Sequence, residues 1–284
     1  MNMFRTYYQL TKPGIIYGNL LSLLAGFLFA SHFHISISLL LGSVIGVGLV
    51  IACGCVINNV FDRNIDARMQ RTQNRAIVKG VVSIPHALVY ASILGIVGFI
   101  VLFRYTNVLT ALLGIIGLFF YVVLYGYAKR TTIYSTWIGS VSGAMPILAG
   151  YTTVTNRIDT AGILLFIIMV FWQMPHFYAI AIYHLQEYTD AQLILWPIKR
   201  GVKETKIQMV VFIILFTIAS ILLTILGYKR IIFAFVMLII CGIWLYKVSI
   251  GFTAIDQTMW GKQSFLFSLI VLLTLCTGLA IPFI

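Results

Sequence analysis

Residues 207–226 read IQMVVFIILFTIASILLTIL, and this stretch decides the fold class of the chain. It carries no charged residue and is as long as an α-helix that crosses the hydrocarbon core of a bilayer, about 20 residues. A strand of a membrane β-barrel would instead alternate apolar and polar residues, and this stretch does not alternate. It therefore predicts a transmembrane helix.

Similar apolar runs recur along the whole chain and predict an all-α membrane protein with nine transmembrane helices. We expect one integral-membrane domain over residues 1–284. The nine runs are 14–33, 36–57, 83–103, 107–127, 133–153, 160–183, 207–227, 230–250 and 265–284.

The composition supports a membrane protein and excludes several other classes. Of the 284 residues, 61% are hydrophobic and only 9% are charged, whereas a soluble domain has about 25% charged residues. An ordinary cytosolic enzyme, a disordered regulator and a secreted disulfide scaffold are therefore excluded. The four cysteines lie in or beside apolar runs, which is typical of packing residues rather than of disulfides or a zinc site.

The net charge of +12 follows a one-sided pattern that predicts the orientation. With the N-terminus inside, four basic residues fall in outside segments: Arg104, Arg157, Lys229 and Arg230. The other fifteen fall in inside segments, so the positive-inside rule predicts a cytoplasmic N-terminus and an outside C-terminus in the cell membrane. Topology explains most of the excess, and nucleic acid is therefore excluded as a partner. An anionic ligand or a lipid surface remains as the partner that would explain the rest of the positive charge.

The first acidic cluster suggests a metal–diphosphate site. Asn58, Asp62 and Asp66 are four residues apart and would share one face of a continued helix. Magnesium takes one or two carboxylates and completes its shell with water and substrate phosphates. Basic residues that can bind phosphate oxygens follow at the same interval: Arg71, Arg75 and Lys79. The alternative is a set of solvated caps, ion pairs and topological anchors.

A second group of polar residues lies within and after the sixth run. His176 lies within the apolar run, where an ionisable residue is costly and is a candidate for function. The alternative is a buried neutral histidine with one hydrogen-bond partner. Glu187 and Asp190 are three residues apart and form a second acidic pair, and a further basic spot, Lys129-Arg130, follows the fourth run.

Taken together, these motifs resemble those of the UbiA superfamily of intramembrane prenyltransferases. The first aspartate-rich motif matches Asn58-x3-Asp62-x3-Asp66 followed by Arg71-Thr72-Gln73-Asn74-Arg75. Within the superfamily the resemblance is to the haem O synthase branch, and it extends from about residue 9 to the end of the chain. The stretches that carry it are Leu10-Thr11-Lys12-Pro13-Gly14, Lys129-Arg130-Thr131, Gly143-Ala144-Met145-Pro146 and Trp172-Gln173-Met174-Pro175-His176.

The resemblance implies helices around a central cavity with its polar site at the cytoplasmic face. It implies Mg²⁺ bridging to farnesyl diphosphate, and farnesyl transfer to a vinyl group of haem B with addition of water. The product, haem O, would pass to a haem A synthase or a terminal oxidase assembly. Implied metal ligands are Asn58, Asp62, Asp66, Glu187 and Asp190; implied diphosphate ligands are Asn59, Arg71, Arg75, Lys79, Lys129 and Arg130.

Two further points concern His176 and the second motif. His176 is expected either to ligate the haem iron or to act as a base in catalysis. Members of the family usually carry an Asp-Tyr pair and then a Gly-x-Pro segment, where this chain has Glu187-Tyr188 and Pro197. Glutamate can replace aspartate as a ligand, but its longer arm changes the reach.

Two other functions are considered. A polyprenyltransferase for an aromatic or quinone precursor would keep the aspartate motif, but the Trp172–His176 stretch argues against it. A transporter of an anionic substrate would also use basic residues near a cavity. Transporters usually show repeats and broken helices at the midplane, whereas the charges here gather at one face.

Overall fold

The computed structural model describes residues 3–281, and every regular element in that range is helical. The first half comprises α1 (Met3–Leu10), α2 (Pro13–Ser31), α3 (Ile37–Phe61), α4 (Arg63–Asp66), α5 (Ile84–Tyr105), α6 (Val108–Phe119), the π-helix η1 (Phe120–Tyr125) and α7 (Gly126–Thr131). The second half comprises α8 (Ser135–Thr155), α9 (Thr160–Tyr183), α10 (Leu185–Asp190), α11 (Trp196–Ile225), α12 (Ile231–Ile250), the 3₁₀ turn η2 (Gly251–Thr253) and α13 (Gln257–Ala280).

Several helices begin at residues that cap them. The side chain of Asn107 accepts a hydrogen bond from the Thr110 amide at the start of α6. Asp159 accepts from the Gly162 amide at the start of α9, and Asp256 accepts from two amides at the start of α13. Such side chains satisfy amides that lack intrahelical partners. Asp159 and Asp256 thus have a structural explanation.

Eight of the described helices are long and apolar enough to cross a membrane, with η1 and α7 continuing α6, and η2 continuing α12. The fold is therefore that of an all-α, multi-pass membrane protein, as predicted. The remaining expected run, 133–153, forms the 21-residue helix α8. Serine, threonine and glycine lower its hydropathy, and a ninth crossing by α8 stays a prediction. The last run was expected to reach residue 284; residues 282–284 lie outside the described range.

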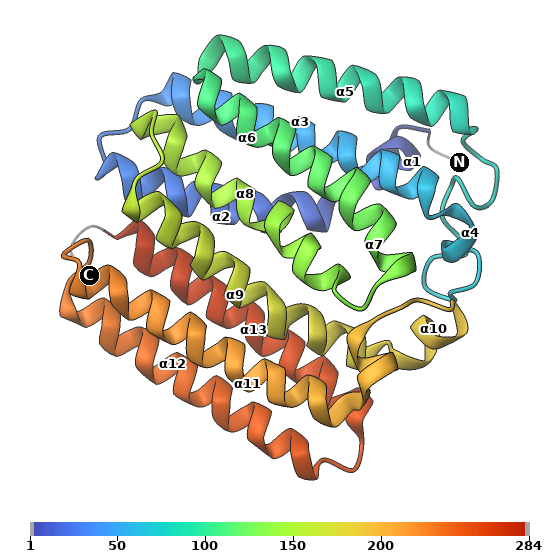
Figure 1. Cartoon of the computed structure of the whole chain (residues 1–284). Helices are drawn as coiled ribbons and strands as arrows, with labels where there is room; N and C mark the ends of the chain where they lie inside the picture. Colours follow the sequence, from blue (N-terminus) through green and yellow to red (C-terminus); the bar gives the residue numbers. More distant parts are fainter. Residues whose placement is uncertain (1–2, 282–284) are drawn as a thin grey trace.

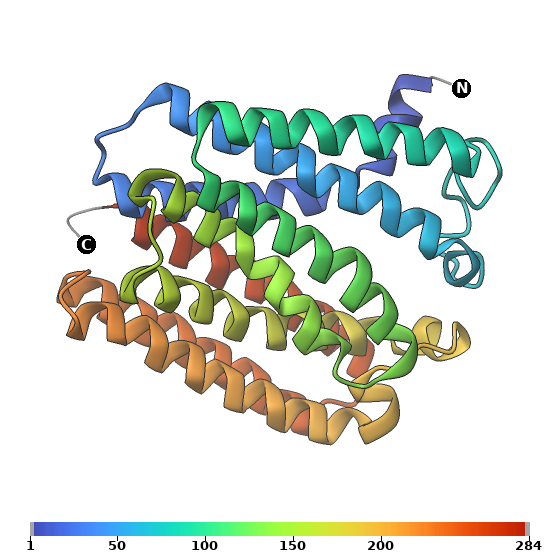
Figure 2. The ribbon, with the colours of Figure 1, turned by 45° about the horizontal axis from the view of Figure 1, so that its top comes forward.

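The long helices run side by side, and neighbours in space are often distant in sequence (Figures 1 and 2). α2 packs on α8, α3 on α5, and α9 on α8, α11 and α13. The contact of α2 with α8 depends on glycine: a Cβ at Gly150 would lie 2.0 Å from the carbonyl oxygen of Leu23. Small residues at such positions let helix backbones approach closely in lipid.

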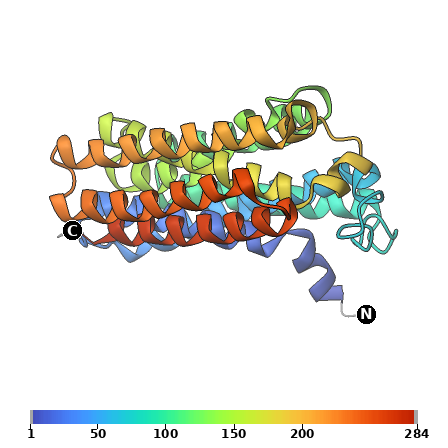
Figure 3. The same cartoon turned by 90° about the horizontal axis from the view of Figure 1, so that it is seen from below.

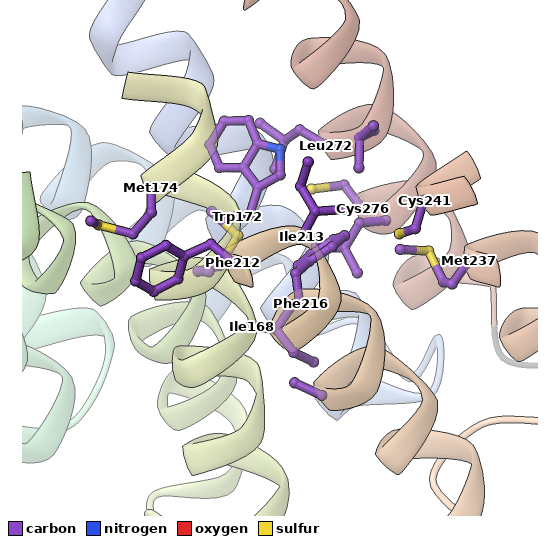
Figure 4. Packing of buried hydrophobic residues seen from close by; sticks show 14 of the residues in the cluster. Ile168, Trp172, Met174, Phe212, Ile213, Phe216, Met237, Cys241, Leu272 and Cys276 are labelled. Atoms are coloured by element: carbon purple, nitrogen blue, oxygen red, sulfur yellow. The ribbon is translucent and has the colours of Figure 1, made fainter. Parts of the chain in front are cut away.

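The largest buried core joins α9, α11, α12 and α13 and includes residues of α2 and α8. Figure 4 shows Trp172 of α9, Phe212 and Phe216 of α11, Met237 of α12 and Leu272 of α13 within it. These side chains are nearly inaccessible to solvent. The core fixes the second half of the bundle and with it the position of α9.

The polar ends of the expected inside segments meet at one end of the bundle. α4, α10 and the last turn of α7 lie there, together with α1 (Figure 1). α1 stands away from the packed helices in the view from below (Figure 3). Residues 67–82, which follow α4, form turns rather than a helix. The charged motifs of the sequence are therefore neighbours in space.

Candidate active site

A cavity of about 680 Å³ opens inside the helix bundle. Its walls come from α2, α3, α6, η1, α8, α9 and α13, and apolar side chains form most of them. Polar and charged side chains from α3, α4, α7 and the turns after α4 gather in one part of the lining: Asn58, Asp62, Asp66, Arg71, Arg75 and Lys129. The cavity thus joins a charged region to a large apolar chamber.

The carboxylate of Asp62 is held between two cations of α7. Lys129 Nζ pairs with Asp62 Oδ2, and an Arg130 guanidinium nitrogen lies 3.2 Å from Asp62 Oδ1. Arg130 also donates to the Phe61 carbonyl oxygen at 2.5 Å. Asp62 and Lys129 are both buried, whereas Arg130 is partly exposed and does not line the cavity. Two residues 67 positions apart in the sequence therefore form one charged unit.

Asp66 forms a second unit one turn further on. Arg75 lies 2.5 Å from Asp66 Oδ2 and donates to Asn59 Oδ1 at 3.2 Å. The expected continuous helix is interrupted, because α3 ends at Phe61 and α4 begins at Arg63. Helical hydrogen bonds nevertheless continue, from the Asp62 amide to the Asn58 carbonyl and from the Asp66 amide to the Asp62 carbonyl. Asn58, Asp62 and Asp66 consequently all line the cavity.

Lys12 belongs to the same site, although the sequence assigned it no role beyond its place in the Leu10–Gly14 stretch and among the inside basic residues. It sits between α1 and α2 with a left-handed backbone, φ 52°, which is uncommon for a residue other than glycine. Its Nζ donates to Asn58 Oδ1 at 2.7 Å and lines the cavity. Burial, reinforced by Arg75, lowers the pKa of Lys12 to about 8. The two residues are 46 positions apart, so no local sequence pattern could have revealed this contact.

The other predicted residues lie around this centre. Arg71 lines the cavity, whereas Lys79 is exposed and lies outside it. Glu187 lies 3.2 Å from His184 Nδ1, and burial and Arg71 lower the pKa of that histidine. Asp190 is exposed and accepts a hydrogen bond from Gln186. Neither acid of α10 lines the cavity, and their role as metal ligands stays a prediction.

The donor set is compatible with magnesium. Between residues 3 and 281 no three His, Cys, Asp or Glu side chains converge to hold a metal. Magnesium does not need three, because it takes one or two carboxylates and fills its shell with water and substrate phosphates. Asp62 and Asp66 supply two buried carboxylates on one wall, beside the cations that a diphosphate would contact.

His176 lies in the apolar part of the cavity lining. α9 runs unbroken through Pro175. The imidazole stacks on Trp172 with ring centroids 4.6 Å apart, and its Nδ1 lies 2.7 Å from Ser268 Oγ of α13. Gln173 also lines the cavity, and its amide donates to the Ser140 carbonyl at 3.0 Å.

Two tyrosines of the π-helix also line the cavity and were not predicted. The rings of Tyr121 and Tyr125 stack with centroids 6.0 Å apart, and Lys129 Nζ lies 5.2 Å from the Tyr125 centroid. π-helical turns are rare and often occur at functional sites. The stretch reads as uninterrupted apolar helix, so no local signal distinguished these tyrosines from those that face lipid.

Comparison with known proteins agrees with this architecture. The profile of the UbiA prenyltransferase family matches residues 19–278. The chain belongs to the UbiA prenyltransferase family and is an integral-membrane prenyltransferase. This assignment decides against the transporter alternative.

Comparison with individual proteins shows which members of that family the chain is similar to. The chain is 41% identical to "Protoheme IX farnesyltransferase 2" of Pseudomonas fluorescens over 98% of its own length and 94% of the relative's. It is 43% identical, with the same coverage, to "Protoheme IX farnesyltransferase" of Pseudomonas savastanoi. A third protein of that name, from Yersinia pseudotuberculosis, is 41% identical over 99% of this chain and 96% of the relative.

Solved structures share the fold. A structure reported for digeranylgeranylglyceryl phosphate synthase aligns with a TM-score of 0.81 at 22% identity over 99% of both chains. A UbiA homolog from Archaeoglobus fulgidus bound to GPP and Mg²⁺ aligns with a TM-score of 0.69 at 13% identity, covering 97% of this chain and 99% of that one. At these identities the likeness concerns the fold alone.

Proposed function

We propose that this chain transfers the farnesyl group of farnesyl diphosphate to a vinyl group of haem B, giving haem O and diphosphate. The observation that carries the proposal is one cavity in which buried carboxylates and cations adjoin an apolar chamber lined by His176. The names of the full-length relatives support haem as the acceptor. The bond between C1 of the farnesyl group and the diphosphate oxygen breaks, and C1 bonds to the terminal vinyl carbon. Water adds its oxygen to the other vinyl carbon and releases a proton.

The charged part of the cavity would stabilise the leaving group. Negative charge builds on the diphosphate as the C–O bond breaks, and a catalyst must bind that charge more strongly in the transition state. Lys12, Lys129, Arg71 and Arg75 line the cavity and are the candidates for this contact. Lys12 already binds Asn58, Lys129 binds Asp62, and Arg75 binds Asp66. Substrate would therefore exchange some of these pairs for contacts with phosphate oxygens.

Magnesium would be held by Asp62 and Asp66, with Asn58 beside them. When bound, it would neutralise charge on the diphosphate oxygens and hold the leaving group in place. The carboxylates themselves keep Lys129 and Arg75 aimed at the site. Tyr188 of α10 lines the cavity, whereas Glu187 and Asp190 do not, so we place these two acids second.

The apolar chamber would hold the farnesyl chain and one face of the porphyrin. Its walls include Leu113, Leu269 and Leu272, whose aliphatic side chains offer no nucleophile to an allylic cation. Excluding bulk water there limits hydrolysis of the diphosphate. His176 and Trp172 lie on the same wall and would contact haem.

The orientation follows from charge. All the site cations belong to the end of the bundle that carries the excess of basic residues, so we propose that the site faces the cytoplasm and the N-terminus lies there. The membrane is then the cell membrane, and the product leaves toward a haem A synthase or a terminal oxidase assembly.

One assay tests the proposal directly. Membranes that carry the chain are incubated with farnesyl diphosphate, haem B and Mg²⁺, and the haem pool is analysed by mass. We expect haem O, and none from parallel membranes without the chain. If no haem O forms while an aromatic acid or quinone precursor becomes prenylated, the acceptor is wrong and the other branch of the family is right.

A further inference from the structure

The hydrogen bonds around Ser268 determine which nitrogen of His176 carries the proton. Ser268 Oγ donates to the Phe265 carbonyl oxygen at 2.5 Å, one turn earlier on α13. A serine hydroxyl has a single proton, so toward His176 Nδ1, 2.7 Å away, this oxygen can only accept. With the hydroxyl proton on that carbonyl, the geometry favours Nδ1 as the protonated nitrogen. No carboxylate pairs with His176 within residues 3–281, which favours the neutral ring, and Nε2 then carries a free lone pair.

The second ring nitrogen, Nε2, is left open on a side chain that lines the cavity. It has no hydrogen-bond partner in the described part of the chain, yet it is not among the fully buried polar atoms that lack one. His176 lines the cavity, so Nε2 is reached from there. A lone pair that has no partner and is open to an apolar chamber suits a ligand that can accept an electron pair.

We propose that Ser268 is a positioning residue that holds His176 as the Nδ1–H tautomer and presents Nε2 as an axial ligand to the iron of haem. A metal-binding histidine nearly always donates its other ring N–H to a fixed acceptor, which sets both tautomer and ring orientation. The iron half of this statement rests on the proposed function, whereas the tautomer half does not.

A second contact makes the arrangement rigid. Trp172 Nε1 donates to the Ser268 carbonyl oxygen at 2.9 Å, and the indole stacks on the His176 ring with an interplanar angle of 25°. Ser268 thus binds the histidine through its hydroxyl and the tryptophan through its carbonyl. Trp172 packs in the core between α9 and α13 (Figure 4). The imidazole can neither flip nor tilt without breaking one of these contacts.

The tautomer is tested without haem. The protein is labelled with ¹⁵N-histidine in nanodiscs, and ring nitrogen shifts separate protonated from unprotonated nitrogens; His176→Ala identifies the signals. We expect a protonated Nδ1 in the wild type and in Ser268→Thr, and loss of this single state in Ser268→Ala. Ser264→Ala is the matched control, because the Ser264 hydroxyl is buried one turn away without a partner. A protonated Nε2 in the wild type, or an unchanged spectrum in Ser268→Ala, would overturn the proposal.

The ligand role is tested by absorption titration with ferric haem B and with iron-free protoporphyrin IX. Ser268→Ala removes the hydroxyl oxygen that accepts from Nδ1, so this variant should bind ferric haem about 10–100-fold more weakly than the wild type does. Iron-free porphyrin should bind the variant and the wild type equally well. Equal haem binding by Ser268→Ala, or an equal loss with iron-free porphyrin, would contradict the ligand role. Failure of the wild type to form haem O would overturn the proposed function and leave the tautomer result standing.

Discussion

Replacing Asp62 by asparagine tests the proposed catalytic role of this carboxylate most directly. The substitution keeps the size of the side chain and removes the negative charge that Lys129 and Arg130 share. We expect haem O formation to fall by at least about 10³-fold. The loss of one preorganised group that stabilises transition-state charge costs about 10²–10³ in kcat, and this carboxylate both holds the proposed metal and aligns two cations.

The same change should also destabilise the fold, by a limited amount. The side chains of Asp62 and Lys129 are only 12% and 8% exposed, so the pair is withdrawn from water. Breaking a buried pair costs about 3–5 kcal/mol. We expect roughly 3 kcal/mol, the lower end of that range. An asparagine oxygen still accepts from Lys129, and Arg130 is 41% exposed and regains water.

The assay measures haem O per folded protein in membranes at saturating farnesyl diphosphate and Mg²⁺, beside thermal unfolding of the purified variant. Asp159→Asn is the control, because it makes the same chemical change at a helix cap outside the cavity. Asparagine caps as well as aspartate does, so this variant should keep its activity. If Asp62→Asn forms haem O at more than a tenth of the wild-type rate, the metal and diphosphate assignment is wrong.

Three further predictions concern other parts of the molecule. His176→Ala should bind haem more weakly and form little haem O; wild-type haem affinity with lost turnover would instead assign proton transfer to His176. Gly150→Ala should lower the thermal midpoint, because its Cβ meets the Leu23 backbone at 2.0 Å, whereas Gly242→Ala, with open space around it, should not. Burial lowers the pKa of Lys229 to about 8. The unfolded state therefore binds more protons between pH 8 and the ordinary lysine pKa near 10.5, and stability should rise with pH in that window. Lys229→Met should flatten this rise, measured as thermal midpoint against pH; an unchanged slope would refute the assignment.

Much of the fold was predictable because its signals are local. Hydropathy over about 20 residues is enough to place a membrane helix, and the predicted runs agree closely with α2, α3, α5, α9 and α12. The first part of α11 was missed: a short, partly polar helical segment begins at Trp196 and is separated from the apolar run by a kink at Gly201, φ 85°. Whether the helix continues past residue 57 was left open by the sequence, and the structure shows helical hydrogen bonds through Asp62 with a break between α3 and α4.

The sequence by itself determined the membrane class, the one-sided charge and the candidate status of Asp62, Asp66 and His176. These follow from composition and from the cost of placing charge in lipid, which no packing can change. Only the tertiary structure decided which groups meet: Lys129 with Asp62, Lys12 with Asn58 and Ser268 with His176, while Lys79 stayed outside. Each of those contacts joins segments far apart in the chain, and helix packing sets their register through small residues and core shape, which no local pattern encodes.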